Sequence, residues 1–366
     1  MISIIGAGPA GSAIAYLLAK SGQPVTIYEE HHTVGRPVEC TGLVTSQFTS
    51  QVKLDGKFLQ NKIRTARIYA PNGRYITISL KQPNLVIDRT AFDRYMAQKA
   101  KSAGARLKLN SRFTGTDGSH INIFDKASGM NHKIQSKTII GADGPSSTVA
   151  KSSGIFGSRQ FLYGAQAVAE LDNDNAIEFY PHVATFGWIV PVDRRTVRIG
   201  VLGRKDTMPA LRQLLKLKGI SKQQIKEMQG GVVPLYNNKI RTYRRFRQQD
   251  IYLIGDAATQ VKATTGGGII PGLKSAAALR SAILNRRDYE SEWKSILGCD
   301  LWLHLYARKI MDRFSDSDWN KLVRIFSKKQ NLRILEDIDR DNATKLFFKL
   351  GIREPRLWQF ALKLFG

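Results

Sequence analysis

The first candidate site in the sequence is a group of glycines near its start. Gly6, Gly8 and Gly11 follow a short apolar run and precede a stretch with the apolar spacing of a helix. In such a pattern the first glycine permits a tight turn, the second lets the backbone approach a pyrophosphate, and the third lets the helix pack closely on the strand. The free N–H groups of the helix start, with Ala10 in the same turn, would bind the phosphates. Glu29 ends the next apolar run, where a carboxylate accepts from ribose hydroxyls, so the pattern predicts a dinucleotide site for FAD or NAD rather than NADP.

Two glycine–aspartate pairs further along the chain decide between these cofactors. Asp143 and Gly144 follow the apolar run TIIGA, and Gly255 and Asp256 follow IYLI. This order of motifs resembles the large FAD family typified by the aromatic hydroxylases. The resemblance implies that Asp256 binds the ribityl hydroxyls of the flavin and that Asp143 and Gly144 lie beside the pyrophosphate. It also implies that Arg89 lies near the FAD phosphates, and together these motifs favour FAD over NAD.

A third glycine group, Gly266, Gly267 and Gly268, precedes Ile269 and an alanine-rich stretch typical of a helix. Residues without side chains let the backbone approach a flat ring closely. The positive end of the helix dipole would stabilise the negative charge of a reduced flavin. In the family that the chain resembles, this helix start points at the pyrimidine edge of the ring.

The elements that must position these residues alternate between strands and helices. A strand at 3–5, a helix at about 9–21 and a strand at 24–28 form a βαβ unit, which is the start of a doubly wound sheet. Further along we expect a hairpin at 63–87, a helix that begins at Asp88 and closes at Gly104, and a short basic helix around 207–218. After about residue 290 the pattern is helical to the end.

The predicted fold class is therefore α/β: a Rossmann-type FAD-binding domain of the aromatic-hydroxylase type with an inserted β-sheet substrate domain and a helical C-terminal region. The FAD-binding domain is expected to be discontinuous and to comprise residues 1–62, 86–154 and 248–290. The substrate-binding sheet domain is expected at 63–85 and 155–247, and the helical region at 291–366.

Composition limits the classes of protein and partner. In a chain of 366 residues, a hydrophobic content of 42% is enough to build cores and excludes a disordered chain. Two cysteines, Cys40 and Cys299, exclude a disulfide scaffold and fit a reducing compartment. We find no signal peptide, no apolar run of transmembrane length and no metal-ligand motif, so a cytoplasmic protein without a metal is expected. The net charge of +26 indicates an anionic partner: nucleic acid, an anionic membrane surface or phosphorylated ligands.

Four stretches beyond the general FAD motifs resemble the geranylgeranyl reductase family, which includes the archaeal digeranylgeranylglycerophospholipid reductases. The resemblance covers nearly the whole chain. The four stretches are GRPVECTG at 35–42, FGWIVP at 186–191, VKATTGGGI at 261–269 and EPRLWQFALKLF at 354–365.

The family resemblance implies an enzyme that saturates isolated C=C bonds of prenyl chains, here those of isoprenoid ether lipids, with hydride from reduced FAD. It places Arg36 and Cys40 beside the flavin, where the Cys40 thiol could gate the site, position the alkene or donate the proton. Phe186, Trp188 and Pro191 would line an apolar channel for the prenyl chain, whereas Cys299 is expected in the core. The chain departs from the family pattern at Phe186, Val190, Val192, Thr259 and Ala263, which bears on the substrate more than on the cofactor.

Two other functions remain open from the sequence. An FAD-dependent monooxygenase or halogenase is the nearer one, because FGWIVP also approaches the W-x-W-x-I-P stretch of halogenases; the Cys40 loop favours the reductase. The other is a basic flavoprotein that binds nucleic acid without turnover. Because we find no base-reading module, no specific nucleic-acid partner is expected.

The remaining partners follow from charge and from the number of motifs. A single dinucleotide motif leaves NADPH, NADH or a ferredoxin open as electron donor. The chain is expected to be a monomer. A peripheral contact with an anionic membrane is expected from two basic, partly apolar segments. They are the cluster Arg241, Arg244, Arg245 and Arg247 with Tyr243 and Phe246, and the tail at 345–366.

Overall fold

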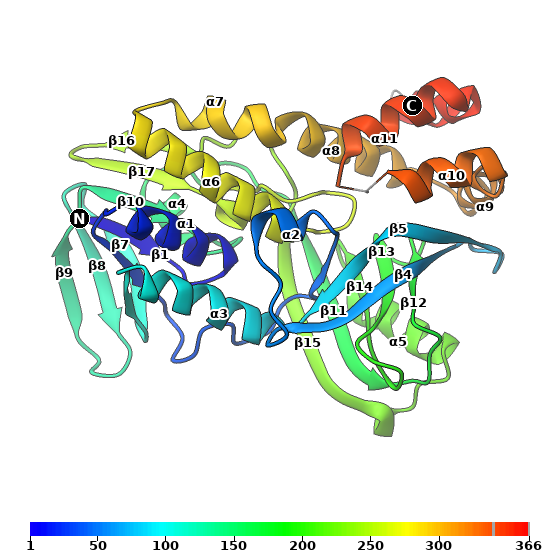
Figure 1. Cartoon of the computed structure of the whole chain (residues 1–366), viewed down its shortest axis with the longest axis horizontal. Coiled ribbons are helices and arrows are strands. Elements are labelled where there is room, and N and C mark those ends of the chain that lie inside the picture. The colour runs from blue at the N-terminus through cyan, green and yellow to red at the C-terminus, as the bar shows by residue number, and fades with distance from the viewer. Residues whose placement is uncertain (339–340, 365–366) are drawn as a thin grey trace.

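The computed structural model of the chain describes residues 1–338 and 341–364. Three β-sheets form its framework, and helices cover the sheets and extend beyond them (Figure 1). The first strands and the last helices lie toward opposite ends of the long axis. Residues 339–340 and 365–366 of the predicted helical region lie outside the described residues.

A six-stranded sheet in the order β16-β17-β10-β1-β2-β6 contains the N-terminus. Five of its strands are parallel, and β16 joins the edge antiparallel to β17. The central strands are continuous apolar runs because both of their faces are covered. The strands are β1 (Ile2–Ile5), β2 (Val25–Tyr28), β6 (Arg106–Lys108), β10 (Thr138–Gly141), β16 (Tyr243–Phe246) and β17 (Gln249–Leu253).

Three helices pack on one face of this sheet, and a small sheet covers the other. The helices are α1 (Pro9–Lys20), α3 (Arg89–Ser102) and α6 (Ile269–Asn285). Their buried side chains, such as Leu18, Phe92 and Leu279, form one core with Ile4 of β1. The opposite face is covered by β7 (Ser111–Thr116), β8 (His120–Asp125), β9 (Asn131–Gln135) and α4 (Thr148–Ser152).

An eight-stranded sheet forms the second part of the molecule, in the order β15-β11-β14-β13-β12-β4-β5-β3. Its strands are β3 (Leu43–Val44), β4 (Leu59–Tyr69), β5 (Tyr75–Ile87), β11 (Phe161–Glu170), β12 (Ala176–Tyr180), β13 (Phe186–Pro191), β14 (Thr196–Gly203) and β15 (Ile225–Pro234). Helix α5 (Thr207–Leu217) covers one face and buries Leu211 and Leu214 against Ile199 and Val201. The other face borders the pocket described below.

The C-terminal helices run from the six-stranded sheet across to the eight-stranded one (Figure 1). They are α7 (Tyr289–Trp293), α8 (Cys299–Met311), α9 (Asp316–Phe326), α10 (Lys329–Asp337), α11 (Ala343–Arg353) and α12 (Trp358–Ala361). Helices α9 and α10 pack against β5, and α11 packs against α8. A short helix, α2 (Phe48–Gln51), lies in the connection between β3 and β4 and buries Phe48. Among the described residues, no helix has both the length and the apolar character needed to cross a membrane.

The predicted fold class is confirmed, with differences in detail. The βαβ unit, the hairpin and the helices expected near 88–104 and 207–218 are present. The division into domains stays a prediction, but two strands pair differently from it: β3 belongs to the eight-stranded sheet and β16 to the six-stranded one. Cys299 was expected in the core, and this is wrong, because it is exposed at the start of α8.

Substitutions at two glycines should distinguish an effect on the stability of the fold from an effect on FAD binding. A Cβ at Gly11 would lie 2.1 Å from the Gly6 carbonyl oxygen, whereas one at Gly8 would meet nothing within 4 Å. We expect Gly11→Ala to lower the free energy of unfolding of the apoprotein by about 2 kcal/mol or more. Gly8→Ala should cost at most about 1 kcal/mol but weaken FAD binding, because its methyl group would face the phosphates. Urea unfolding and FAD titration measure the two effects, and equal destabilisation by both substitutions would contradict this account.

Candidate functional site

The glycine turn between β1 and α1 is shaped by close backbone contacts. Gly6 has a φ of +98°, and a Cβ there would lie 2.4 Å from the carbonyl oxygen of Ala142. Gly11 packs just as closely on Gly6 itself. Gly8, at the start of α1, faces open space. The turn therefore leaves room beside the free N–H groups of the helix, as a phosphate site requires.

Glu29 is buried at the end of β2 and stabilises this turn. Its Oε2 accepts from the Ala7 backbone N–H at 2.8 Å, and its Oε1 accepts from the His31 backbone N–H at 3.0 Å. The carboxylate thus links the first glycine turn to the segment after β2. Its predicted contact with the ribose stays a prediction.

The three glycine motifs meet where α1 crosses α6. A Cβ at Gly255 would lie 3.1 Å from the Ala10 side chain, and one at Gly268 would lie 2.6 Å from Oδ1 of Asp256. The motif at 255–256 therefore lies between the first glycine turn and the glycines at 266–268. The sequence indicated each motif separately, and the structure brings them together.

Asp143 is buried beside this group and caps a helix. Its Oδ1 accepts from Ser147 Oγ at 2.6 Å, and its Oδ2 accepts from the Val149 backbone N–H at 3.0 Å. Gly144 follows with a φ of +75° and open space at its Cβ position. The carboxylate of Asp143 is therefore engaged by α4, and its predicted place beside the pyrophosphate is untested.

Sequence reasoning missed Arg159, which connects two of these motifs. Its guanidinium donates to the Ala257 carbonyl at 2.8 Å and to the Pro145 carbonyl at 3.3 Å. Burial lowers its pKa to about 10, although the negative charge of Asp143 acts in the opposite direction. A lone arginine in a loop offers no local pattern that would single it out.

Arg89 is the first residue of α3, and its charge is largely engaged within the protein. Its Nε and Nη2 donate to the two carboxylate oxygens of Asp93 at 3.1 and 3.0 Å. It also forms a side-chain hydrogen bond with Cys40. Arg89 thus lies beside the loop that carries Cys40, and its predicted contact with the FAD phosphates stays a prediction.

The loop at 35–42 is held by the eight-stranded sheet. Arg198 of β14, which is buried, donates to the Thr41 carbonyl at 2.5 Å and to the Ile87 carbonyl at 3.1 Å. The Gly42 backbone N–H donates to Cys40 Sγ at 3.3 Å. Arg36, by contrast, is exposed and lies 3.6 Å from Glu227 of β15. Its predicted place beside the flavin remains untested.

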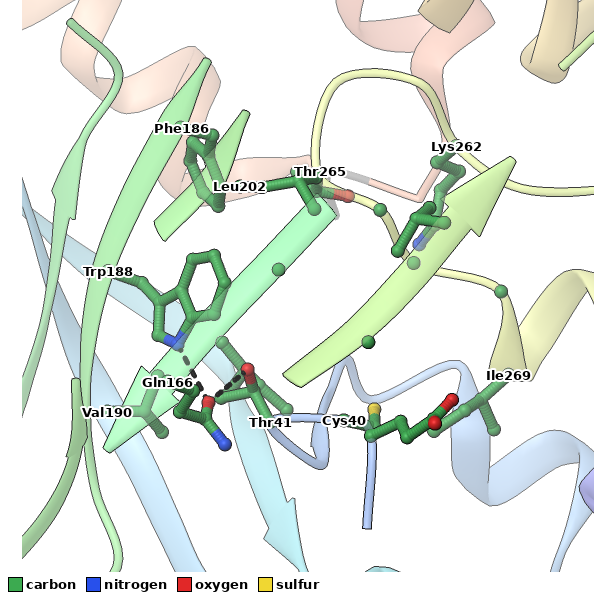
Figure 2. Close-up of a pocket in the computed structure, with 18 of the residues that line it drawn as sticks. Cys40, Thr41, Gln166, Phe186, Trp188, Val190, Leu202, Lys262, Thr265 and Ile269 are labelled. Atoms are coloured by element: carbon green, nitrogen blue, oxygen red, sulfur yellow. Dashed lines mark hydrogen bonds between the residues drawn. The ribbon is translucent and has the colours of Figure 1, made fainter. Parts of the chain in front are cut away.

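A largely apolar pocket lies between this loop, the open face of the eight-stranded sheet and the glycines at 266–268. Phe186, Trp188 and Val190 line it from β13, because alternate residues of a strand face the same side. Figure 2 shows them opposite Cys40 and Ile269. Pro191, predicted as the third substrate contact, is not among the described residues that line this pocket. It falls on the other side of the strand, and Val190 takes its place.

Trp188 is fixed by amides that sequence reasoning missed. Its indole N–H donates to Gln166 Oε1 at 3.0 Å, and Thr41 Oγ1 donates to the same oxygen at 2.7 Å (Figure 2). The Gln166 amide donates in turn to Gln229 Oε1 at 2.6 Å. The ring lies over Gly200, where a Cβ would be 2.5 Å from it. The indole therefore has one orientation at the pocket wall and is tied to the Cys40 loop.

The C-terminal region also contributes to the pocket. Asp341 forms an ion pair with Lys262, and its Oδ2 accepts from Thr45 Oγ1 at 2.9 Å. Both charged groups line the pocket. Lys262 lies over Gly267, so the pair connects the C-terminal helices to the glycines at 266–268. Nothing in the sequence around Asp341 indicated this contact.

Two further carboxyl groups border the region that the motifs enclose. Burial raises the pKa of Asp256 to about 6, partly opposed by the positive charge of Arg89. Burial also raises the pKa of Glu39, which lines the pocket next to Cys40 and is attracted to His31 and Arg89. The site thus combines the positive N-terminal end of a helix, carboxyl groups whose pKa is raised by burial, and an apolar wall.

Comparison with known protein families identifies the fold of this site. The family described as FAD binding domain matches residues 1–286 of the chain. The chain belongs to the FAD binding domain family. The geometry fits FAD: Gly8 leaves open space at the start of α1, Gly144 leaves open space after β10, and Asp256 presents a carboxylate next to Gly268.

Among curated relatives, this member of the FAD binding domain family is similar to the digeranylgeranylglycerophospholipid reductase of Methanocaldococcus jannaschii. The two are 28% identical over 390 residues, which cover 98% of this chain and 96% of the relative. The resemblance to the geranylgeranyl reductases that the motifs indicated is thereby confirmed.

Solved structures show the same fold. A geranylgeranyl bacteriochlorophyll reductase-like protein from Thermoplasma acidophilum matches with a TM-score of 0.83 and 21% identity, covering 98% of this chain and 97% of that chain. A flavin-dependent brominase matches with a TM-score of 0.71 and 18% identity, covering 100% of this chain and 98% of that chain. Both likenesses concern the fold alone.

The pKa of Asp256 predicts a dependence of apoprotein stability on pH. The folded protein keeps this proton up to about pH 6, whereas an unfolded chain loses it near pH 4. Raising the pH from about 4 through 6 therefore costs wild-type stability, by up to about 3 kcal/mol. Asp256→Asn should make the apoprotein more stable than the wild type at pH 8, with no difference below pH 4. The same substitution should weaken FAD binding.

Urea unfolding at several pH values and FAD titration test this pair of effects. Matched Asp55→Asn, at a half-buried aspartate whose Oδ1 accepts from the Lys57 backbone N–H at 2.9 Å, should change neither quantity by much. An Asp256→Asn apoprotein less stable than the wild type at pH 8 would show that the carboxylate is not penalised by burial.

Proposed function

We propose that this chain is an FAD-dependent reductase that saturates isolated C=C bonds of prenyl chains, namely the geranylgeranyl chains of isoprenoid ether glycerophospholipids. The observation that carries the proposal is the apolar pocket between the FAD-binding motifs and the Trp188 wall. The similarity to digeranylgeranylglycerophospholipid reductases over nearly the whole chain supports it. Reduced FAD, when bound, supplies the hydride for one alkene carbon.

The pocket residues would orient the alkene and keep water away from it. An isolated C=C bond has no carbonyl group to polarise, so the protein must hold it in place and exclude water. Phe186, Trp188, Val190 and Leu202 offer an apolar wall for a prenyl chain. Gln166 keeps the indole of Trp188 from turning into the pocket.

Cys40 is the residue that we assign to the reacting end of the chain. Its thiol lines the pocket and lies beside Arg89 and within the electrostatic reach of Arg198. From this position Sγ would contact the alkene and hold the proton that the second carbon requires. Glu39, the neighbouring carboxyl group, would return a proton to this end of the pocket.

The reductase proposal is tested without oxygen. The FAD-loaded protein is reduced with dithionite and mixed with a geranylgeranylated ether phospholipid. We expect reoxidation of the flavin and product masses that rise in steps of two hydrogens. NADPH, NADH or reduced ferredoxin in place of dithionite would identify the donor. Absence of turnover with every prenyl substrate would refute the proposal, and rapid oxygen-dependent hydroxylation or halogenation would support the monooxygenase or halogenase instead.

Substitutions within the pocket sharpen this test. Cys40→Ala should keep FAD bound but lower the turnover number by about a hundredfold or more, as is typical for a group that acts in proton transfer. Trp188→Ala should mainly raise KM for the prenyl substrate, because it removes an apolar contact of the pocket wall rather than a reacting group. The exposed Cys299 offers a matched control, since Cys299→Ala should leave both constants unchanged. Equal activity of the Cys40→Ala and Cys299→Ala proteins would exclude Cys40 from the reaction.

We further propose that the protein binds anionic membranes peripherally through a C-terminal surface. This surface consists of the exposed apolar residues Phe348, Ile352, Trp358 and Leu362 with the basic residues Lys345, Lys349 and Arg353. Phe348 and Ile352 are one helical turn apart on α11, and 69% and 67% of their surface is exposed. Apolar side chains ringed by lysine and arginine suit the interface of an anionic bilayer.

The arginine cluster near β16 does not extend this surface. Arg244 donates to the Ser153 carbonyl at 2.6 Å, Arg245 pairs with Asp250 at 2.7 Å, and Arg247 donates to the Asp117 carbonyl at 2.7 Å. Figure 1 shows β16 and α11 toward opposite ends of the molecule. The cluster therefore serves the fold of the FAD-binding part, and the membrane proposal depends on the C-terminal surface alone.

Vesicle flotation tests the membrane proposal. The wild type should float with vesicles that contain anionic phospholipid at low salt, and binding should weaken as salt rises. Phe348→Ser with Ile352→Ser should abolish most of the flotation. Leu217→Ser, at an exposed leucine on α5, is the control and should float like the wild type. Flotation that is unaffected by the double substitution would exclude this surface.

A further inference from the structure

A second, polar pocket lies at the end of the eight-stranded sheet, outside the site described so far. The loops before β13 and after β14 and the C-terminal part of α8 line it, and its volume is about 290 Å³. Its polar side chains are His182, Arg204, Lys205, Arg308, Asp312 and Asp316. The inference drawn from it rests on the proposed function, because it concerns the substrate of the same reaction.

Helix α8 links the polar pocket to the apolar one. Its Leu305 packs in the cluster that contains Leu202 and Phe186, while Arg308, one turn later, lines the polar pocket. Leu202 of β14 and Phe186, the first residue of β13, line the apolar pocket, whereas their neighbours Gly203 and Thr185 line the polar one. Because neighbouring residues of a strand face opposite sides, the two pockets lie on either side of these strand ends. A molecule with an apolar chain and a polar end would have to pass around the strand ends beside α8 to occupy both.

The charges in the polar pocket favour an anion. Arg308 is only 2% exposed; its Nη1 donates to the Thr185 carbonyl at 3.0 Å, and its Nε lies 2.8 Å from Oδ1 of Asp312. The other oxygen of Asp312 lies 3.2 Å from Nη2 of Arg204. One carboxylate thus faces two guanidinium groups, and Lys205 adds a third, exposed cation.

The remaining polar groups of the pocket do not cancel this excess of positive charge. Asp316 is exposed and acts electrostatically on His182, whose pKa is lowered by burial, so the imidazole is neutral at pH 7. Among the described residues, no hydrogen-bond partner faces the buried Nδ1 of His182. A neutral imidazole and guanidinium groups that share a carboxylate are groups that phosphate oxygens can satisfy.

We propose that this polar pocket binds the phosphate headgroup of the lipid substrate while a prenyl chain lies in the apolar pocket. Arg204 and Lys205 would contact the phosphate directly, and the buried Arg308 would hold Asp312 and the loop ends in position. The pocket lies close to the C-terminal helices, since Phe314, which lines it, packs against Phe360 of α12 with ring centroids 4.9 Å apart. The headgroup site therefore lies next to the C-terminal surface from which a membrane lipid would arrive.

The test compares two substrates that carry the same prenyl chain, a geranylgeranylated ether phospholipid and the neutral alcohol geranylgeraniol. Arg204→Glu with Lys205→Glu should lower kcat/KM for the phospholipid at least about tenfold, as expected for lost charge-assisted contacts. The value for the alcohol should change less than about twofold, because the alcohol carries no phosphate for these contacts. Arg194→Glu with Arg195→Glu reverses two exposed charges in the turn at the other end of the same strands. This control protein should have the same kcat/KM as the wild type for both substrates.

Several outcomes would overturn the inference. An equal loss for both substrates, or an equal loss in the control protein, would show that the pocket does not recognise the phosphate. If the Arg204→Glu substitution destabilises the protein beside Asp312, Arg204→Gln with Lys205→Gln removes the charges without repulsion and should still discriminate between the substrates. A wild type that reduces the alcohol and the phospholipid with no effect of either variant would refute the inference alone. A wild type that reduces neither would refute the proposed function as well.

Discussion

Close contacts between backbone segments, at positions where a side chain would not fit, hold the FAD-binding motifs together. A Cβ at Gly11 would lie 2.1 Å from the Gly6 carbonyl, and one at Gly6 would lie 2.4 Å from the Ala142 carbonyl. These distances are shorter than any Cβ contact that a folded protein tolerates, so they fix α1 against the ends of β1 and β10. The same geometry brings Gly255 against Ala10 and Gly268 against Asp256. The shape of the cofactor site is therefore set by close backbone contacts that leave no room for side chains, and it does not depend on a bound ligand.

Buried cations make the second set of constraints and couple the two large sheets. Arg198 of β14 donates to the carbonyls of Thr41 and Ile87. Arg89 of α3 binds Asp93 of the same helix and Cys40 of the loop. Removing a guanidinium from water is costly unless its N–H groups find acceptors. The loop at 35–42 therefore has to follow the acceptors that these two arginines need. Cys40 lines the pocket because the loop must supply acceptors to these two arginines. Its position therefore depends on residues far away in the sequence, although its motif is a short one.

The sequence predicted the parts of the site that depend on local geometry. The three glycine motifs and Glu29 could be found because turns and helix starts have short-range signatures. Trp188 could be placed by the two-residue period of a strand, and the same period explains why Val190 rather than Pro191 lines the pocket. Gln166, Arg198 and Asp341 could not be found, because their roles depend on long-range contacts. Thr41 meets Gln166 across 125 positions, and Thr45 meets Asp341 across 296.

The proposed headgroup pocket separates the residues that would select the substrate from those that would react with it. Thr185, directly before β13, and Gly203, at the end of β14, line the polar pocket next to Phe186 and Leu202 in the apolar one, and α8 reaches both pockets within one turn. Arg204 and Lys205 line the polar pocket, whereas Cys40 and the glycines at 266–268 line the apolar one, so we expect changes of charge at 204 and 205 to leave hydride transfer undisturbed. The departures from the family pattern at Phe186 and Val190 also fall on the pocket wall. Because the glycine contacts leave no room for a side chain whereas the pocket wall consists of side chains, we expect substitutions on the wall to alter substrate preference while the cofactor site stays fixed.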